Sequence, residues 1–234
     1  MKNKSSKSRG AKTAKPPKEQ KLSRTHAPAE ISPVEWQRVL RRQFGREQAF
    51  GLENIDTEPF FSEFRVSNPQ SKSAYRVAIR GKLPGDNYCA CPDYATNDLG
   101  TCKHIEFVLA ALGKKRGAKS AFARGYHPPF SELYLRNDGG RAIHFRPGMD
   151  CPPSVLKAAG LLFDAAHGWI LPQEKFGELE RFVAAVIKSG HELRAYDDAL
   201  DFVAGRRDAD RRAASLDSLF PRGGADPLLK KLLK

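Results

Sequence analysis

The chain of 234 residues lacks any long apolar segment. No uninterrupted run approaches the roughly 18 apolar residues that span a bilayer, and the polar, basic first residues predict neither a secretory signal nor a membrane anchor. Cysteine is scarce, with four in the whole chain. In a reducing cytoplasm, close cysteine pairs more often hold a metal than form disulfides. We therefore expect a cytoplasmic protein without a membrane partner, which associates with the nucleoid if it binds DNA.

Catalytic signatures are also missing from the sequence. There is no Gly-x-Ser-x-Gly elbow, and the nearest approach to a phosphate-binding loop, Gly113-Lys114, lacks the upstream glycine and the following Ser or Thr. Several histidines stand alone, without a metal-spaced or catalytic neighbour: His127, His144, His167 and His191. Because no nucleophile, base and open metal position come together, we expect that the chain is not an enzyme.

Positive charge is plentiful but uneven. Of the net charge of +13, residues 1–24 supply +8, from nine Lys or Arg against Glu19 alone. Such a segment cannot bury apolar surface, so we expect disorder, with a phosphate-binding arm and a solubilising leader as equal alternatives. The sequence predicts a basic tail over 1–30, a metal-site domain over 31–125, an α+β region over 126–220 and a tail or linker over 221–234.

Periodicity predicts an α+β fold. Ser32, Pro33 and Glu35 form the start of a capped helix that runs to about residue 43, followed by a hairpin with Phe64 and Val66 on one face of its first strand. The helix also carries Arg38, Arg41 and Arg42, which suit either a solvated face or phosphate contact. The aromatic residues of the hairpin fit a core better than a base-stacking platform: Phe60, Phe61, Phe64 and Tyr75.

The cysteines that follow have the spacing of a metal site. Cys89 and Cys91 are two residues apart on an expected third strand, where alternate side chains point the same way. Cys102 and His104 must straddle the first turn of a helix, because residues two apart inside a helix point in different directions. Four protein ligands of this type suit one tetrahedral, structural zinc ion, with no open position for an activated water.

The bridge between the two ligand pairs, residues 92–101, is rich in turn residues. A metal would offset the entropy of closing such a loop. Asp93 is a candidate acceptor for the free nitrogen of His104, although an Asp after Pro is more often a turn residue.

This pattern resembles the SWIM zinc finger, and the string from Cys89 to Leu109 is similar to the version in bacterial SWI/SNF-type helicases. Residues 42–50 and 191–200 also resemble the N-terminal regions of those helicases. The resemblance implies an accessory region that binds DNA or protein for a motor, with the same four zinc ligands. Relatives continue into a helicase core that this sequence does not contain, so a truncated, split or stand-alone version is expected.

Beyond the metal site, residues 114–124 carry five positive charges and no acid. They are the best local candidates for phosphate contact, against a plain solvated loop: Lys114, Lys115, Arg116, Lys119 and Arg124. A second region of hairpin and helices follows. It is expected to have strands around residues 133–135 and 143–145, helices over 153–163, 174–188 and 197–214, and a buried free thiol at Cys151.

Three functions remain open at this point. The first is a nucleic-acid-binding accessory module, with DNA favoured, in association with a helicase core. The second is a protein-interaction adaptor with a structural zinc and no nucleic-acid contact. The third, an independent enzyme, has the least support, since no catalytic constellation is present.

Overall fold

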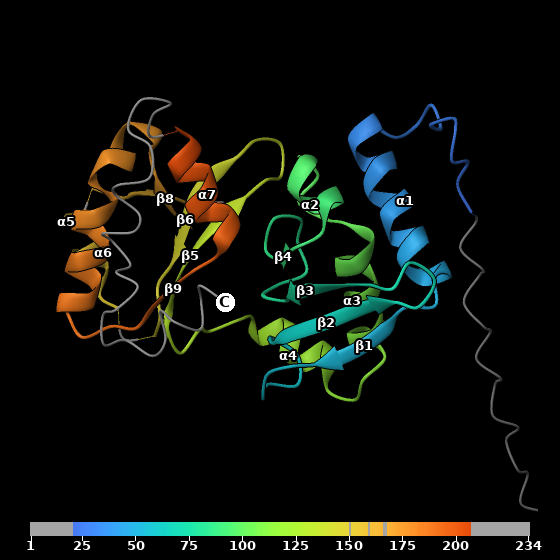
Figure 1. Ribbon diagram of the computed structural model, residues 1–234, viewed down its shortest axis with the longest axis horizontal. Coiled ribbons are helices and arrows are strands. Elements are labelled where there is room, and N and C mark those ends of the chain that lie inside the picture. Colours follow the sequence, from blue (N-terminus) through green and yellow to red (C-terminus); the bar gives the residue numbers. More distant parts are fainter. Residues whose placement is uncertain (1–20, 150, 159, 166–167, 207–234) are drawn as a thin grey trace, which may run out of the picture.

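The computed structural model describes residues 21–149, 151–158, 160–165 and 168–206. They form two sheets, each with its own helices and its own hydrophobic core (Figure 1). The α+β fold expected from the sequence is confirmed. The described part of the expected tail, residues 21–30, contacts the first helix, for example through Arg24, which pairs with Glu47 at 2.8 Å.

The first sheet is antiparallel and follows chain order. Its strands are β1 (Gly51–Asn54), β2 (Glu63–Asn68), β3 (Ser73–Ala78) and β4 (Tyr88–Cys89). Alternation places Phe64 and Val66 of β2 in the core, as expected. Burying each of these side chains stabilises the fold by about 1.5–3 kcal/mol. The other hairpin aromatics pack against this core while staying partly buried, as the core interpretation predicts.

Two helices belong to this half, α1 (Pro33–Glu47) and α3 (Lys103–Gly113). The predicted cap of α1 is confirmed, because the Ser32 hydroxyl accepts a hydrogen bond from the Glu35 N–H at 3.2 Å. The two helices touch at Gly45, where an added Cβ would lie 2.7 Å from the Lys103 carbonyl oxygen and 2.8 Å from the Phe107 nitrogen. Only glycine lets the two backbones approach this closely.

The second sheet is mixed and has the order β7-β8-β6-β5-β9. Its strands are β5 (Ser131–Arg136), β6 (Ala142–Arg146), β7 (Leu162–Asp164), β8 (Gly168–Leu171) and β9 (Leu193–Ala195). The helices are α5 (Pro153–Ala158), the 3-10 helix η1 (Gln173–Glu178), α6 (Leu179–Lys188) and α7 (Asp197–Arg206). The predicted β5–β6 hairpin is confirmed, whereas β9 adds to β5 in parallel.

Several expected elements differ from the observed ones. The helix expected over 153–163 ends at Ala158, because Gly160 adopts φ +81° and the chain then enters β7. A short helix, α2 (Pro92–Thr96), occupies part of the bridge that was expected to be turn, and α4 (Ala118–Arg124) occupies the expected basic loop. Residues 207–214 of the last expected helix lie outside the described residues, and they include Arg207, Asp208, Arg211 and Arg212. The expected tail over 221–234 and His167 also lie outside the described residues.

A buried polar network joins the two sheets. Glu132 of β5 is fully buried and receives hydrogen bonds from Arg80, just after β3, at 2.8 Å, and from Arg146 of β6 at 2.5 Å. The hydroxyl of Tyr196 donates to the same carboxylate at 2.9 Å and accepts from Arg80 at 2.8 Å. Burial would raise the pKa of Glu132, but the two guanidinium groups outweigh it and hold the pKa below its usual value.

The loop of the β5–β6 hairpin makes the second connection, because it reaches the α2 region (Figure 1). The Asn137 amide donates to the backbone oxygens of Tyr94 and Asn97, at 3.0 and 3.2 Å. Arg141 donates to the Ala95 oxygen. Among the described residues, no helix has both the length and the apolar character needed to cross a membrane.

Candidate metal centre and adjoining basic segment

The four predicted ligands lie together. The candidate donor atoms of Cys89, Cys91, Cys102 and His104 are all within 4.8 Å of one another, and all four residues are buried. They come from β4, from the start of α2 and from the start of α3. Three soft sulfurs and one imidazole nitrogen are a donor set that fits a tetrahedral metal ion. The chain therefore contains a group that could hold a metal ion.

Local backbone geometry explains how the cysteines converge. Cys91 is extended, with φ −83° and ψ 151°, as the following Pro92 requires. The sequence placed Cys91 on the third strand, but the structure makes it the N-cap of α2. Its sulfur accepts a hydrogen bond from the Tyr94 N–H at 3.4 Å. Cys102 is the extended N-cap of α3, so Cys102 and His104 straddle the first turn as predicted.

His104 packs against two aromatic rings. Its ring centroid lies 5.0 Å from that of Phe50 and 5.0 Å from that of Tyr75. Its Nδ1 atom is 3.9 Å from the Cys89 sulfur, so this nitrogen faces the cysteine cluster. The proposed acceptor Asp93 has other partners instead, since its carboxylate receives hydrogen bonds from Arg41 at 2.8 Å and from Asn97 at 3.3 Å.

The thiols of the cluster do not ionise equally. Burial raises the pKa of Cys89 and of Cys102, even though Cys102 occupies a helix N-cap. The pKa of Cys91 is lowered, first by hydrogen bonding from Cys102 and then from Cys89. Because metal ligands must be thiolates, binding a divalent metal here would release protons from the buried thiols, and the affinity would increase with pH.

The basic residues beyond α3 are exposed. The chain turns at Gly117, with φ +86°, and continues into α4. Within the part of the chain that the structure describes, no ion pair is made by Lys114, Lys115, Arg116 or Lys119, and Arg124 donates to the Ser120 hydroxyl at 2.9 Å. The sequence signal of five cations without an acid thus corresponds to an exposed cationic surface.

The arginines of α1 serve the fold rather than a solvated face or a phosphate site. Arg38 donates to the Leu99 oxygen at 2.9 Å, Arg41 pairs with Asp93 at 2.8 Å, and Arg42 lies 3.5 Å from the Glu106 carboxylate. These contacts tie α1 to the bridge and to α3. These contacts could not be predicted from charge alone, because the sequence of a helix does not show which group its arginine will bind.

Four other residues that the sequence singled out lie outside the metal-ligating group. Cys151 is a buried free cysteine, as expected. His144 is buried, His127 is exposed and contacts the Arg124 carbonyl oxygen at 3.0 Å, and His191 is partly buried. None of these three histidines belongs to the metal-ligating group.

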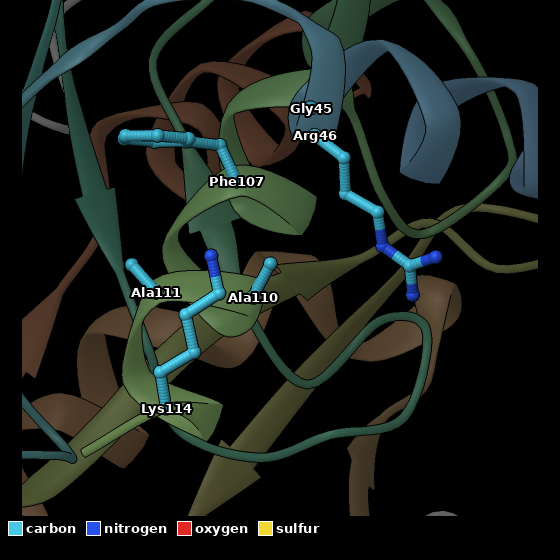
Figure 2. A pocket seen from close by; sticks show the side chains of 6 residues that line it. All are labelled: Gly45, Arg46, Phe107, Ala110, Ala111 and Lys114. Carbon is cyan, nitrogen blue, oxygen red and sulfur yellow. The ribbon is translucent and has the colours of Figure 1, made fainter. Parts of the chain in front are cut away.

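Sequence reasoning missed two residues beside the basic segment. Phe107 and Arg46 line a depression together with Lys114 (Figure 2). Phe107 lies one helical turn after His104 and packs partly buried against the core of the first half, and its place on the same helix as His104 was the available signal.

No family model, curated protein or solved structure matches the chain. The resemblance to SWIM zinc fingers and SWI/SNF-type helicases stays a prediction that rests on the sequence motif. The Cys and His cluster itself rests on geometry.

Proposed function

We propose that this chain is a zinc-stabilised accessory module that binds nucleic acid, with DNA favoured, and acts beside a SWI/SNF-type helicase core carried elsewhere. The observation that supports nucleic-acid binding is the exposed cationic segment at the end of the metal-site helix α3. Exposed Lys and Arg side chains that have no acidic partner are the groups that displace counterions from phosphates. The helicase association rests on the motif resemblance alone.

The metal in this proposal is one zinc ion. Sulfur and imidazole donors suit zinc better than magnesium or calcium, which prefer oxygen ligands. With four protein ligands the tetrahedral shell is complete, so the ion stabilises structure and does not activate water. The proposal therefore assigns no catalysis to this chain, and chemistry belongs to the helicase partner.

The zinc assignment can be tested by metal analysis. Purified protein is expected to contain one zinc per chain, and Cys102→Ser is expected to lose most of it, because a hydroxyl is a poor ligand for zinc. Cys151→Ser is the matched control, since Cys151 is also buried but lies outside the cluster. Full zinc retention in Cys102→Ser would contradict the ligand set.

Nucleic-acid binding is tested by titrating labelled single-stranded and duplex DNA at several salt concentrations. We expect measurable binding whose logarithm falls linearly with the logarithm of salt concentration. The double variant Lys114→Ala/Lys115→Ala should weaken binding and reduce the magnitude of that slope by about 0.7–0.9 for each phosphate that the variant no longer neutralises. Deleting residues 1–24 tests the arm separately. Unchanged affinity and slope in both variants would refute the phosphate contacts.

An adaptor function is the second candidate, and one observation favours it. Strand β7 lies at an edge of the second sheet and exposes Leu162 and Phe163, with 59% and 63% of their surface accessible. An exposed apolar edge strand is a surface to which another chain can add a strand. Under this alternative the DNA titrations show no binding. A helicase core expressed together with the chain should copurify with it, and Phe163→Lys should abolish that copurification.

A further inference from the structure

Lys82 lies beside the cationic segment in space, although the helices α2 and α3 separate the two in the sequence. It follows β3, in the loop that leads to β4, and its ammonium nitrogen lies 4.8 Å from the centroid of the Phe122 ring. Phe122 belongs to α4, the helix that continues the cationic segment. This contact therefore brings a sixth cation against the five that residues 114–124 carry.

Phe122 is also a neighbour of one of those five cations. Lys119 lies three residues before it on α4, and residues three apart are neighbours on a helix surface, with Cβ atoms about 5–6 Å apart. Lys82 reaches the same ring from the β3–β4 loop. Lys82 and Lys119 therefore both border Phe122, close enough to contact the same stretch of a charged chain.

The charge of Lys82 is available to a ligand. The residue is exposed, and within the part of the chain that the structure describes it makes no ion pair. The carboxylate of nearby Asp86 has other partners, since it accepts a hydrogen bond from the Leu83 N–H at 3.0 Å and lies 3.4 Å from the Arg136 guanidinium. An aromatic ring attracts an ammonium group without neutralising its charge, so the N–H donors of Lys82 can still bind an anion.

Aromatic packing holds α4 next to Lys82. The Phe122 ring packs edge-to-face against Phe61, with centroids 5.4 Å apart, and its centroid lies 6.3 Å from that of Phe60. Phe60 also lies close to the turn at Gly117, where an added Cβ would be 3.8 Å from its ring. The segment just before β2 thus seats the turn and α4, and Lys82 follows the next strand of the same sheet. This shared support fixes Lys82 relative to the other cations.

We propose that Lys82 is a phosphate-binding residue of this surface, so that nucleic acid crosses α4 and contacts two separate segments of the chain. This inference rests on the proposed nucleic-acid binding and adds to it a contact outside residues 114–124. One compact anion would need only one or two of these cations. Cations that extend from the end of α3 across α4 to the β3–β4 loop suit a ligand whose charge repeats along its length, as in a phosphate backbone.

Titrations of a labelled duplex and of a labelled single strand of equal length, at several salt concentrations, test this contact. Lys82→Gln should weaken binding and lower the magnitude of the salt slope by about 0.9 on the duplex and about 0.7 on the single strand, the values for one phosphate. Lys82→Arg keeps the positive charge, so it should keep the slope. In the Lys114→Ala/Lys115→Ala background, Lys82→Gln should lower the slope by the same amount again, because it contacts a different phosphate.

Lys72→Gln is the matched control. Lys72 is also exposed and makes no ion pair among the described residues, but it precedes β3, whereas Lys82 follows it. The strand has 6 residues, so the two lysines are separated by about 20 Å or more at ~3.3 Å per residue. This variant should bind as the unaltered chain does.

The outcomes separate this inference from the proposed function. If Lys82→Gln leaves the slope unchanged, or if Lys72→Gln lowers it equally, Lys82 is not a phosphate contact. The proposed nucleic-acid binding then still stands, provided that Lys114→Ala/Lys115→Ala lowers the slope. Absence of binding to either oligonucleotide, or binding of polyglutamate in their place, would overturn both.

Discussion

Replacing Glu132 with Gln should be among the most damaging single changes in the chain. The carboxylate is fully buried, and each of its oxygens faces a different guanidinium, Oε1 that of Arg80 and Oε2 that of Arg146. An amide offers an oxygen to only one of them and turns an N–H group toward the other. The substitution thus leaves buried positive charge without compensation.

The expected cost follows from this burial. The side chain of Arg80 is only 4% exposed and that of Arg146 is 18% exposed, so water cannot replace the missing partner well. Breaking a buried pair by removing one member costs about 3–5 kcal/mol, a large part of the roughly 5–15 kcal/mol that stabilises a typical domain. We expect Glu132→Gln to lose stability in this range.

Urea unfolding measures this loss, and the two tryptophans locate it. Trp36 lies in α1 and Trp169 in β8, so a Trp36→Phe background reports on the second sheet and Trp169→Phe on the first half. In the unaltered chain the two tryptophans should report unfolding at the same urea concentration. Because Glu132 joins the two sheets, Glu132→Gln should make the two unfolding transitions occur at different urea concentrations. The matched control is Glu53→Gln, which breaks the exposed pair with Arg65 and should cost about 1 kcal/mol or less.

The same network predicts a pH dependence. The pKa of Glu132 is lowered in the folded chain, so its contribution is complete above the unfolded value near 4.5 and is lost as the pH falls through the folded value. Glu132→Gln should lack this part of the acid limb. Three results together would refute this role of the network. They are a loss of unfolding free energy no larger than that of Glu53→Gln, unfolding transitions that still coincide, and the same loss of stability at acidic pH as in the unaltered chain.

Three further results are expected. Gly45→Ala should destabilise by about 1–3 kcal/mol in urea, because its methyl meets backbone atoms of α3 that cannot rotate away, whereas Gly113→Ala, whose methyl meets nothing, should not. Burial raises the pKa of Asp198 to about 7, so its ionisation opposes folding as the pH rises from about 4 to 7; Asp198→Asn should add up to about 4 kcal/mol at pH 8. Withdrawing the metal with a chelator should lower the melting temperature, and restoring zinc should reverse this.

The cluster of Cys and His residues that could hold a metal ion was predictable from the sequence, because its determinants are local. Pro92 fixes the extended backbone of Cys91, and the apolar stripe after His104 fixes where α3 begins. The cap at Ser32 was predictable for the same reason. Each of these features depends on residues within a turn or two of one another, which is the range over which propensity and periodicity operate.

The sheet that follows was less predictable, since its strands are short and its pairing is long-range. Strand β9 has three residues and gains its place only by parallel pairing with β5, some sixty positions earlier in the chain. Leu162 and Phe163 continue a helical pattern in sequence, but the positive φ of Gly160 directs them into β7 instead. Tertiary pairing decided the place of β9, whereas at β7 the left-handed conformation of a glycine ended the helical pattern.

Charged residues were the least predictable part of all. Arg80 and Glu132 resemble surface residues in the sequence and become the buried link between the sheets. The arginines of α1 were expected to face solvent or phosphate, but they bind groups of the protein itself. Whether a charge is available to a ligand depends on its acidic neighbours in space, and those come from distant parts of the chain.

Helix α3 connects the candidate metal centre to the exposed cationic segment. Cys102 and His104 lie at its start, its first half packs against Gly45 of α1, and its last residues lead into Lys114. The position and tilt of this one helix therefore determine where Lys114 lies. Under the proposed function, a zinc ion that does not touch nucleic acid would still determine where Lys114 lies, because fixing the start of the helix limits where its end can lie.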